Sequence, residues 1–293
     1  MGARFFDGEK VESKNMKKDT LGITQPDSDP SGLRGFNFNV RVPEKSEMFD
    51  EAEAKAYING CDYPETVDDL LLALEVQNLF GHGAIRNMSI LDAMCGPGRL
   101  GRELMELGAQ HVIFHDGDET MISHAKNQAS AIMQSGQSVG IVKSPVDDIP
   151  IPDHKLDLIV CHNSTHQLSS LDRLQIVMKE FLRIISPGGH ILIADYQRST
   201  SPDFFKALEE RLQWTRPEIV PLLIPSFTAA FSKEEFGSVL NSIPGIQKCS
   251  VTDAAPPVLT DQLRKRVDAD PVKGHLMDFS PISLRVLVKK EGM

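Results

Sequence analysis

Residues 90–101 read Ile-Leu-Asp-Ala-Met-Cys-Gly-Pro-Gly-Arg-Leu-Gly, an apolar run that passes into a glycine-rich turn. The run predicts a buried strand over residues 89–93, and residues 99–107 after the turn predict a helix. Three glycines around the turn have the G-x-G-x-x-G spacing: Gly96, Gly98 and Gly101. Because glycines permit a tight turn and let a ligand approach the backbone, this segment predicts a site for a nucleotide-like cofactor. A tight turn that binds nothing is the alternative interpretation.

Strand and helix patterns alternate on both sides of this turn. The expected helices are 51–58, 66–80, 99–107, 120–133, 171–185, 202–214 and 232–240, and the expected strands are 89–93, 112–115, 139–143, 156–161, 190–195, 247–252 and 282–289. Parallel strands need crossover helices, so the alternation predicts an α/β fold with a doubly wound, mostly parallel sheet and helices on both faces. The last two strands are expected to form a closing antiparallel pair.

Local signals place several boundaries more closely. The segment Thr66-Val-Asp-Asp69 is expected to cap the second helix, and Ser232-Lys-Glu-Glu235 has the capping-box pattern of a helix start. The proline-rich stretch up to Pro225 is expected to be an irregular excursion from the sheet. The apolar segment 214–231, which overlaps this stretch, has two interpretations. It is either the wall of an apolar substrate pocket, or it is core or a homodimer contact.

The chain is expected to divide into an arm and one domain. Residues 1–48 are polar and predict a partly disordered arm or lid, with an alternating segment at 36–42 that is either a short strand or an extended lid. Residues 49–293 are expected to form a single Rossmann-like domain. Within it, 49–82 form a helical cap and 198–245 a substrate-side insertion.

Composition excludes several classes of partner. The formal net charge of -10 would repel a phosphate backbone, so a nucleic-acid substrate is not expected. The four cysteines lie far apart with no CxxC pair, which indicates free thiols and no zinc site. Neither a signal peptide nor a membrane-spanning apolar run is present, so a cytoplasmic protein without membrane partners is expected.

Two aspartates at the ends of predicted strands help to distinguish the candidate cofactors. Asp92 lies near the carboxyl end of the first strand, where a dinucleotide site seats a pyrophosphate and gains nothing from a carboxylate. The ammonium and sulfonium groups of S-adenosylmethionine are instead attracted by one. Asp116 ends the second strand, where a carboxylate can accept hydrogen bonds from the ribose hydroxyls of either cofactor. The alternative for Asp116 is a surface residue that caps the next helix through Asp118-Glu-Thr120.

Five segments, in order along the chain, resemble the motifs of the class I (Rossmann-like) S-adenosylmethionine-dependent methyltransferases, in the branch that modifies small molecules. The segments are Leu91–Gly98, His115–Met121, Ile149–Val160, Thr165–Leu168 and Ile185–Asp195. The resemblance covers roughly residues 50 to 293. It implies a seven-stranded sheet with a reversed last strand, methyl transfer from S-adenosylmethionine, and S-adenosylhomocysteine as product.

The resemblance also implies roles for individual residues. The expected cofactor-binding residues are Tyr57, Asp92, Met94, Gly96, Gly98, Asp116, Gly117, Met121, Val146, Asp147 and His162. Asp92 and the loop Gly96–Gly98 are expected to hold the methionine moiety, and Asp116 the ribose. Gly117 and Met121 are expected to flank the adenine.

Three positions of this expected site carry alternatives or departures. Tyr57 either closes a lid over the cofactor or packs on the sheet. Met94 stands where the family usually has the first glycine of its loop, which narrows the space above the methionine moiety. The usual adenine-binding acid aligns with Pro145, so its contact is either missing or supplied by Asp147, while Val146 offers its backbone amide.

The expected reaction is an in-line displacement on the methyl group, driven mainly by proximity. A base is needed only if the acceptor must lose a proton, and His166 is the first candidate, with a packing or helix-start role as its alternative. His162 and Tyr196 are weaker candidates. The competing function is an NAD-dependent oxidoreductase, and a non-catalytic S-adenosylmethionine-binding protein is a further one.

Overall fold

The computed structural model describes residues 40–44, 50–61, 68–81, 83–198, 201, 203–208, 220–254 and 283–292. The predicted arm at 1–48 therefore lies outside the described residues except for 40–44. Residues 40–44 are irregular, and residues 36–39 of the segment predicted as a strand or an extended lid lie outside the described residues. The domain boundaries stay predictions.

Six of the expected helices are found as such, the expected helix 202–214 is helical over its described residues 203–208, and one further helix appears where none was predicted. The helices are α1 (Glu51–Cys61), α2 (Asp68–Phe80), α3 (Arg99–Glu106), α4 (Glu119–Ile132), α5 (Leu171–Ile184), α7 (Val220–Ala229) and α8 (Lys233–Asn241), with two short 3₁₀ turns, η1 (Ile85–Asn87) and η2 (Thr165–Gln167). The capping box at Ser232 is confirmed, because its side chain accepts from the Glu235 amide and the Glu235 carboxylate accepts from the Ser232 amide.

Helix α7 corrects the prediction of an irregular excursion up to Pro225. Pro225 lies inside this helix, yet the chain remains helical from Val220 to Ala229. A proline removes the hydrogen bond that its amide would have donated, here to the carbonyl of residue 221, and its ring crowds that carbonyl. The helix forms nevertheless and packs against η2, and the substrate-pocket wall and the homodimer contact proposed for residues 214–231 stay predictions.

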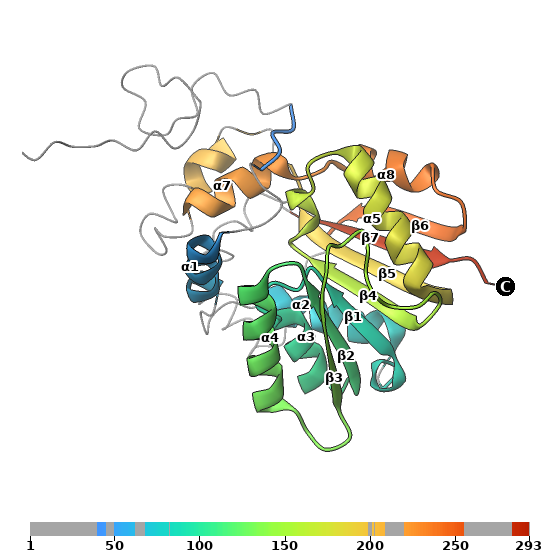
Figure 1. The fold of residues 1–293 in the computed structure, drawn as a ribbon. Helices are drawn as coiled ribbons and strands as arrows, with labels where there is room; N and C mark the ends of the chain where they lie inside the picture. The colour runs from blue at the N-terminus through green and yellow to red at the C-terminus, as the bar shows by residue number, and fades with distance from the viewer. Residues whose placement is uncertain are drawn as a thin grey trace, which may run out of the picture. The chain divides into compact units, whose positions relative to one another are not determined.

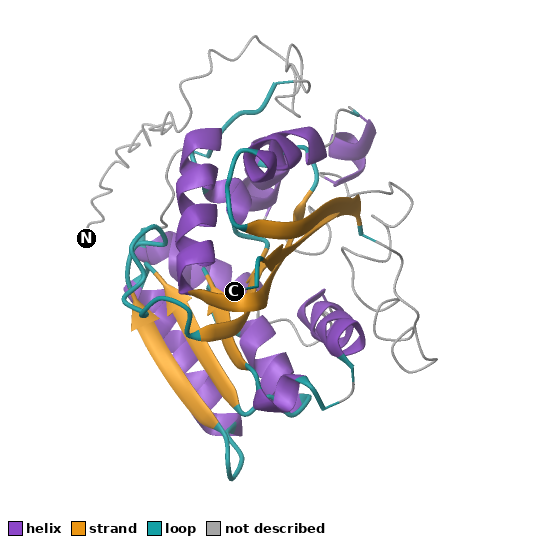
Figure 2. Ribbon diagram, turned by 90° about the vertical axis from the view of Figure 1, so that its right-hand side faces the viewer, coloured by secondary structure: helices purple, strands orange, loops and turns teal. Residues whose placement is uncertain are grey.

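The seven strands form one sheet with the order β3-β2-β1-β4-β5-β7-β6. They are β1 (Ser89–Ala93), β2 (His111–Asp116), β3 (Ser138–Lys143), β4 (Leu156–His162), β5 (Ile185–Tyr196), β6 (Ile246–Asp253) and β7 (Ser283–Lys290). Strands β1 to β5 pair in parallel, whereas β7 is antiparallel to both β5 and β6. The reversed last strand and the closing antiparallel pair are thus confirmed, and Figure 2 shows the sheet as one continuous twisted layer.

Each face of the sheet buries its own apolar core. Alternate residues of a strand point to opposite faces, and in β1 Leu91 joins the core under α5 and α8, whereas Ile90 joins the core under α2, α3 and α4. In β4 the same division separates Ile159 from Leu158. Figure 1 shows these helices on the two sides of the sheet. Among the described residues, none of the helices has the length and apolar character needed to cross a membrane.

Candidate functional site

The loop after β1 turns through the left-handed region of φ. Met94, Gly96 and Gly98 have φ values of 53°, 52° and 76°. This region is uncommon for a side chain as long as Met, so neighbouring groups must hold it in place. The Met94 amide donates to His115 Nδ1 at 3.3 Å, and its carbonyl accepts from Ser164 Oγ at 2.9 Å. Met94 therefore keeps the left-handed backbone that the glycine usual in this family adopts without strain.

The glycines of the loop have two different roles. A Cβ atom at Gly101 would lie 2.3 Å from the Phe114 ring, and one at Gly98 would lie 2.6 Å from Ala125 Cβ. Those two glycines let α3 pack closely against β2 and α4. A Cβ at Gly96 would meet no atom within 4 Å, so the loop is open at that position. Open space beside a left-handed backbone is what a ligand that approaches the main chain requires.

The two predicted acids lie at the carboxyl ends of neighbouring strands. Asp92 is buried and accepts a hydrogen bond from the Gly101 amide at 2.9 Å. Asp116 accepts from the Gly96 amide at 2.8 Å and from the Asp118 amide at 2.9 Å. Burial raises the pKa of both carboxyl groups. Since carboxylates removed from solvent favour a nearby cation, the cationic sulfonium and ammonium of S-adenosylmethionine fit this edge of the sheet.

The N-cap residue of helix α4 is Asp118 and not Asp116. The Asp118 side chain accepts from the Met121 amide at 2.8 Å. The interpretation of Asp116 as a helix cap is therefore wrong. Met121 is buried and packs with the α1 residues Ala54 and Ile58, with Tyr57 against the same cluster. Helix α1 thus packs over the start of α4, and the lid role of Tyr57 stays a prediction.

The segment after β3 is fixed by contacts to two other elements. His115 Nε2 lies 3.1 Å from the Ser144 carbonyl oxygen, so the His115 ring joins this segment to the Met94 loop. Val146 is part of the core under α5. The Asp147 carboxylate is bound by the Arg173 guanidinium, whose hydrogen bond lowers the pKa of Asp147. In this arrangement Asp147 ties the segment to the start of α5.

A residue that the sequence analysis assigned to a cap lies at the centre of an ion-pair cluster. Asp69 of α2 lies 2.6 Å from His162 Nδ1 and 3.0 Å from Arg99 Nε. Burial opposes ionisation of Asp69, but His162 and Arg99 outweigh it and lower the pKa of this carboxyl group. His162, predicted on the cofactor side, is thus oriented by Asp69. The sequence around Asp69, an acid at a predicted helix start, did not indicate its contact with His162.

His166 is held in place by Asp195, a pairing that the sequence analysis missed. His166 lies in η2 and is 3% exposed, and Asp195 near the end of β5 is 2% exposed. Nδ1 of His166 lies 2.7 Å from Asp195 Oδ1, and its amide donates to Oδ2 at 2.9 Å. The Thr165 hydroxyl also donates to Asp195. Burial opposes protonation of His166, but the Asp195 charge and hydrogen bond, together with Glu44, raise the pKa of the imidazole.

Two residues of the segment 40–44 complete this region, and neither was predicted. Glu44 Oε1 lies 3.6 Å from His166 Nε2. The Arg41 guanidinium donates to the carbonyls of Ala229, Ser169, His166 and Leu168. It also lies 3.9 Å above the centre of the Phe231 ring. The alternation at 36–42 gave no indication that Arg41 fixes the turn that carries His166.

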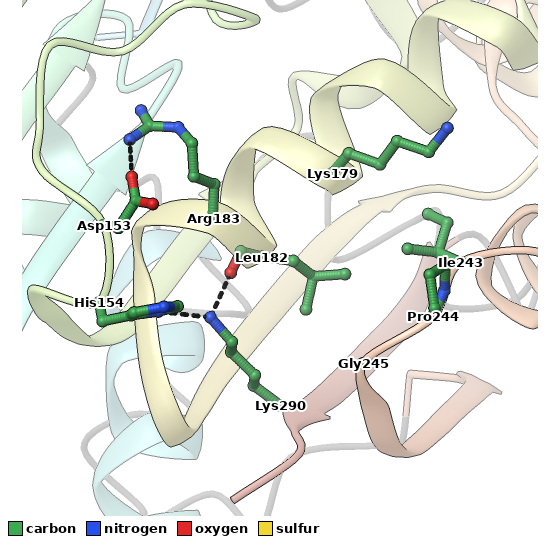
Figure 3. A pocket seen from close by; sticks show the side chains of 9 residues that line it. All are labelled: Asp153, His154, Lys179, Leu182, Arg183, Ile243, Pro244, Gly245 and Lys290. Carbon is green, nitrogen blue, oxygen red and sulfur yellow. Dashed lines mark hydrogen bonds and ion pairs between the residues drawn. The ribbon is translucent and has the colours of Figure 1, made fainter. Parts of the chain in front are cut away.

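A surface hollow lies away from this region (Figure 3). It is lined by Asp153, His154, Lys179, Leu182, Arg183, Ile243, Pro244, Gly245 and Lys290, near the amino ends of β4, β5 and β6. Lys290 Nζ donates to His154 and to the Leu182 and Ile185 carbonyls, and Arg183 binds Asp153. Ligands in open α/β sheets gather at the opposite, carboxyl ends of the strands. The hollow is therefore not the candidate site.

Comparison with known proteins identifies the family. A family model described as "Methyltransferase domain" matches residues 90–189, from β1 to the turn within β5. A ubiquinone/menaquinone biosynthesis C-methyltransferase of Hahella chejuensis is 23% identical over 195 residues, 64% of this chain and 73% of that protein. Residues 90–189 therefore form a methyltransferase domain, and the chain is similar to class I S-adenosylmethionine-dependent methyltransferases. A malonyl-[acyl-carrier protein] O-methyltransferase of Pseudescherichia vulneris is 25% identical over 166 residues, 56% of this chain and 59% of that protein.

Solved structures show the same fold. The match to a methyltransferase from Aquifex aeolicus covers 83% of this chain and 100% of that chain, with a TM-score of 0.55 and 19% identity. The plantazolicin methyltransferase in complex with SAH covers 84% of this chain over 93% of its own, with a TM-score of 0.56 and 14% identity. This chain therefore uses S-adenosylmethionine as its cofactor. The alternative of an NAD-dependent oxidoreductase is set aside.

Proposed function

We propose that the methyltransferase transfers the methyl group to a small-molecule acceptor and that His166 removes a proton from that acceptor. The observation that carries this proposal is the pairing of a buried His166 with Asp195 on one side while Nε2 points away from Asp195. An imidazole oriented by a carboxylate through Nδ1 is an effective base at Nε2, because the carboxylate stabilises the imidazolium that forms. The acceptor is expected to lie on the Nε2 side.

The turn with His166 is physically joined to the cofactor loop. The Ser164 hydroxyl lies 2.9 Å from the Met94 carbonyl oxygen and 2.8 Å from the His162 carbonyl oxygen and shares its one proton between them. A base placed two residues after Ser164 therefore keeps a fixed relation to the loop that we assign to the methionine moiety. Fixed geometry between the reacting groups is the main source of rate in such a displacement.

We assign the cofactor contacts as follows. The backbone at Gly96 and the carboxylate of Asp92 hold the methionine moiety, Asp116 holds the ribose, and Met121 and Tyr57 enclose the adenine. S-adenosylmethionine supplies a methyl group on a cationic sulfur, which departs as a neutral thioether. The remaining assigned contacts are Met94, Gly98, Gly117, Val146, Asp147 and His162, of which Asp147 and His162 act from their ion pairs with Arg173 and Asp69.

The test is methyl transfer from a labelled donor to metabolite fractions. The wild-type enzyme is expected to label one small-molecule fraction, and His166→Gln is expected to label it 10²- to 10⁴-fold more slowly, the usual contribution of a general base. Glu119→Gln, an exposed residue paired with Lys143, serves as the control. An unchanged rate in His166→Gln would exclude the base role, and label in a protein fraction alone would exclude a small acceptor.

A further inference from the structure

The side of His166 that faces the expected acceptor is in contact with a carboxylate of the same chain. Glu44 Oε1 lies 3.6 Å from His166 Nε2 and accepts a hydrogen bond from Ser226 Oγ at 2.8 Å. A hydroxyl donor from α7 and the Nε2 atom of η2 thus lie beside the same Glu44 oxygen. The Glu44 side chain is 13% exposed, and the Tyr196 ring lies 5.1 Å from the His166 ring and is tilted by 38° against the Phe227 ring.

The charges around this oxygen are balanced. Asp195 and Glu44 carry negative charge, and His166 and Arg41 carry positive charge, so the four groups sum to zero when the imidazole is protonated. These are the charged groups that act on His166 from β5 and from the segment 40–44. Removal of the Glu44 carboxylate alone would leave a net positive charge in a nearly dry region. The place of Glu44 Oε1 is therefore suited to an anionic oxygen and not to an ammonium group.

The contact is also one that a ligand can displace. A separation of 3.6 Å is an ion-pair distance, but it is longer than a hydrogen bond. The opposite contact, from Nδ1 to Asp195 at 2.7 Å, is a full hydrogen bond. His166 is thus firmly held through Asp195 and only loosely held through Glu44.

We propose that the acceptor presents an acidic oxygen, as in a carboxylic acid, phenol or enol, at the place that Glu44 Oε1 holds between His166 and Ser226. This inference rests on the proposed base role of His166. When the acceptor binds to the form with a neutral His166 ring, the Glu44 side chain moves aside, the O–H bond of the acceptor breaks, its electron pair stays on oxygen, and the proton goes to Nε2. The resulting pair of imidazolium and oxyanion has the same charges as the pair of imidazolium and Glu44.

The experiment follows the His166 ring by NMR with ¹⁵N-labelled histidine, without any acceptor or turnover. In Glu44→Ala the titration midpoint of His166 is expected to fall, because one stabilising carboxylate is removed. Acetate is expected to restore the midpoint with saturable binding, and 4-nitrophenolate to do the same if phenols are accepted. Acetamide, which has the same shape without charge, is expected to have no effect.

Two further variants make the result specific. Glu44→Gln is expected to lower the midpoint and to bind acetate more weakly than Glu44→Ala, because its carboxamide must first move aside. Glu44→Ala combined with Ser226→Ala is expected to bind acetate at least about tenfold more weakly, through the loss of a hydrogen bond to a charged group. If Glu44→Ala does not fold, an unchanged His166 midpoint in Glu44→Gln would still overturn the proposal.

Two results would contradict the proposed place for an acidic oxygen. An acetate effect that does not saturate, or one that is equal in the single and double variants, would show that no oxyanion place exists beside His166. In that case a slow His166→Gln variant would still support the base role, and only the class of acceptor would be wrong. If both fail, the proposed function fails as well.

Discussion

Asp195 accepts two hydrogen bonds from His166, one from ring Nδ1 at 2.7 Å and one from the backbone amide at 2.9 Å. The carboxylate therefore fixes both the position of the turn and the tautomer of the ring. In Asp195→Asn the amide nitrogen can face Nδ1 and favour the tautomer with its proton on Nε2, which cannot accept a proton there. We expect kcat to fall about 10²- to 10⁴-fold while cofactor affinity stays within about threefold.

Turnover of labelled methyl groups and calorimetric titration with S-adenosylhomocysteine measure the two quantities. A parallel loss of cofactor affinity in Asp195→Asn would mean that Asp195 supports the whole edge of the sheet and not the base. Unchanged turnover would mean that the orientation of His166 is irrelevant to the reaction.

The pH dependence of kcat/KM follows from the same pair. Burial opposes protonation of His166, but Asp195 and Glu44 outweigh it, and the pKa of the imidazole is raised above its ordinary value of 6.5. A base must be neutral to act, so the rate is expected to rise with pH through a limb above pH 6.5. In Glu44→Gln this limb is expected to move to lower pH. If the pH limb of kcat/KM does not move in Glu44→Gln, the rate does not depend on the protonation of His166.

A rise in pH is expected to change the stability of the fold and the rate of the reaction in opposite directions. Since the pKa of His166 is higher in the folded than in the unfolded chain, the contribution of the protonated ring is complete below the unfolded pKa. It is lost as the pH rises through the folded pKa. The enzyme is therefore expected to become more active and slightly less stable over the same range of pH.

His115 predicts a second dependence of stability on pH, with the opposite sign. Its buried ring accepts from the Met94 amide and faces the Ser144 carbonyl through Nε2, an arrangement for the neutral ring. Burial lowers the pKa of His115 to about 4. The neutral ring contributes fully above the unfolded pKa of about 6.5, and about 3 kcal/mol is lost as the pH falls to 4.

The variant His115→Gln keeps a donor and an acceptor but does not titrate. Chemical unfolding at pH 7 and pH 4.5 is expected to show a smaller difference in the free energy of unfolding for His115→Gln than for the wild type. His111→Gln, at an exposed position of the same strand, is the control. An equal pH difference in wild type and His115→Gln would assign acid sensitivity to other groups.

The arrangement of strands and helices was largely predictable because it depends on local periodicity. The strand β1 has the same bounds as its apolar run, and its alternate residues Ile90 and Leu91 face the two separate cores. The cofactor loop was predictable for a similar reason, since Gly96 and Gly98 directly follow that strand. The helix over Val220–Ala229 was missed because prolines weigh against a helix locally, whereas packing against η2 favours one.

The partners of the site residues were not predictable from local patterns. His166 and Asp195 are 29 residues apart and meet because β4 and β5 pair in parallel, which makes the ends of both strands neighbours. An acid at the carboxyl end of β5 was a signal that could have indicated Asp195. Glu44 lies 122 positions before His166, and no periodicity links a short irregular segment to a distant turn.

Gly101 offers a steric test of the glycine spacing. A Cβ in Gly101→Ala would lie 2.3 Å from the Phe114 ring, which is fully buried and has little room to move. Overpacking of this kind costs about 1–3 kcal/mol, so the midpoint of thermal unfolding is expected to fall. Gly237→Ala is the matched control, because its Cβ meets no atom within 4 Å inside α8 and alanine favours a helix. Equal midpoints for the two variants would contradict the packing role of Gly101.

Arg41 is expected to be irreplaceable by lysine, although the charge would be kept. Its guanidinium donates to carbonyls of η2, of the segment after it and of α7, at 2.6 Å for Ala229 and 3.0 Å for His166 and Ser169. A single ammonium group cannot reach all of these oxygens, which diverge like the fork of the guanidinium. Carbonyls left without a donor cost about 1–3 kcal/mol, so Arg41→Lys is expected to be less stable by that amount.

The same substitution is expected to affect the site more than the cofactor. Because Arg41 joins Glu44's segment to the turn of His166, Arg41→Lys should raise KM for the acceptor and shift the His166 titration toward that of Glu44→Gln. Affinity for S-adenosylhomocysteine should stay unchanged, since Arg41 contacts the segment 166–169, Ala229 and Phe231, and none of these is an assigned cofactor contact. The exposed Arg86→Lys is the control for the substitution itself. If Arg41→Lys loses stability but keeps the acceptor KM and the His166 midpoint, Arg41 only holds the fold together and does not position the base.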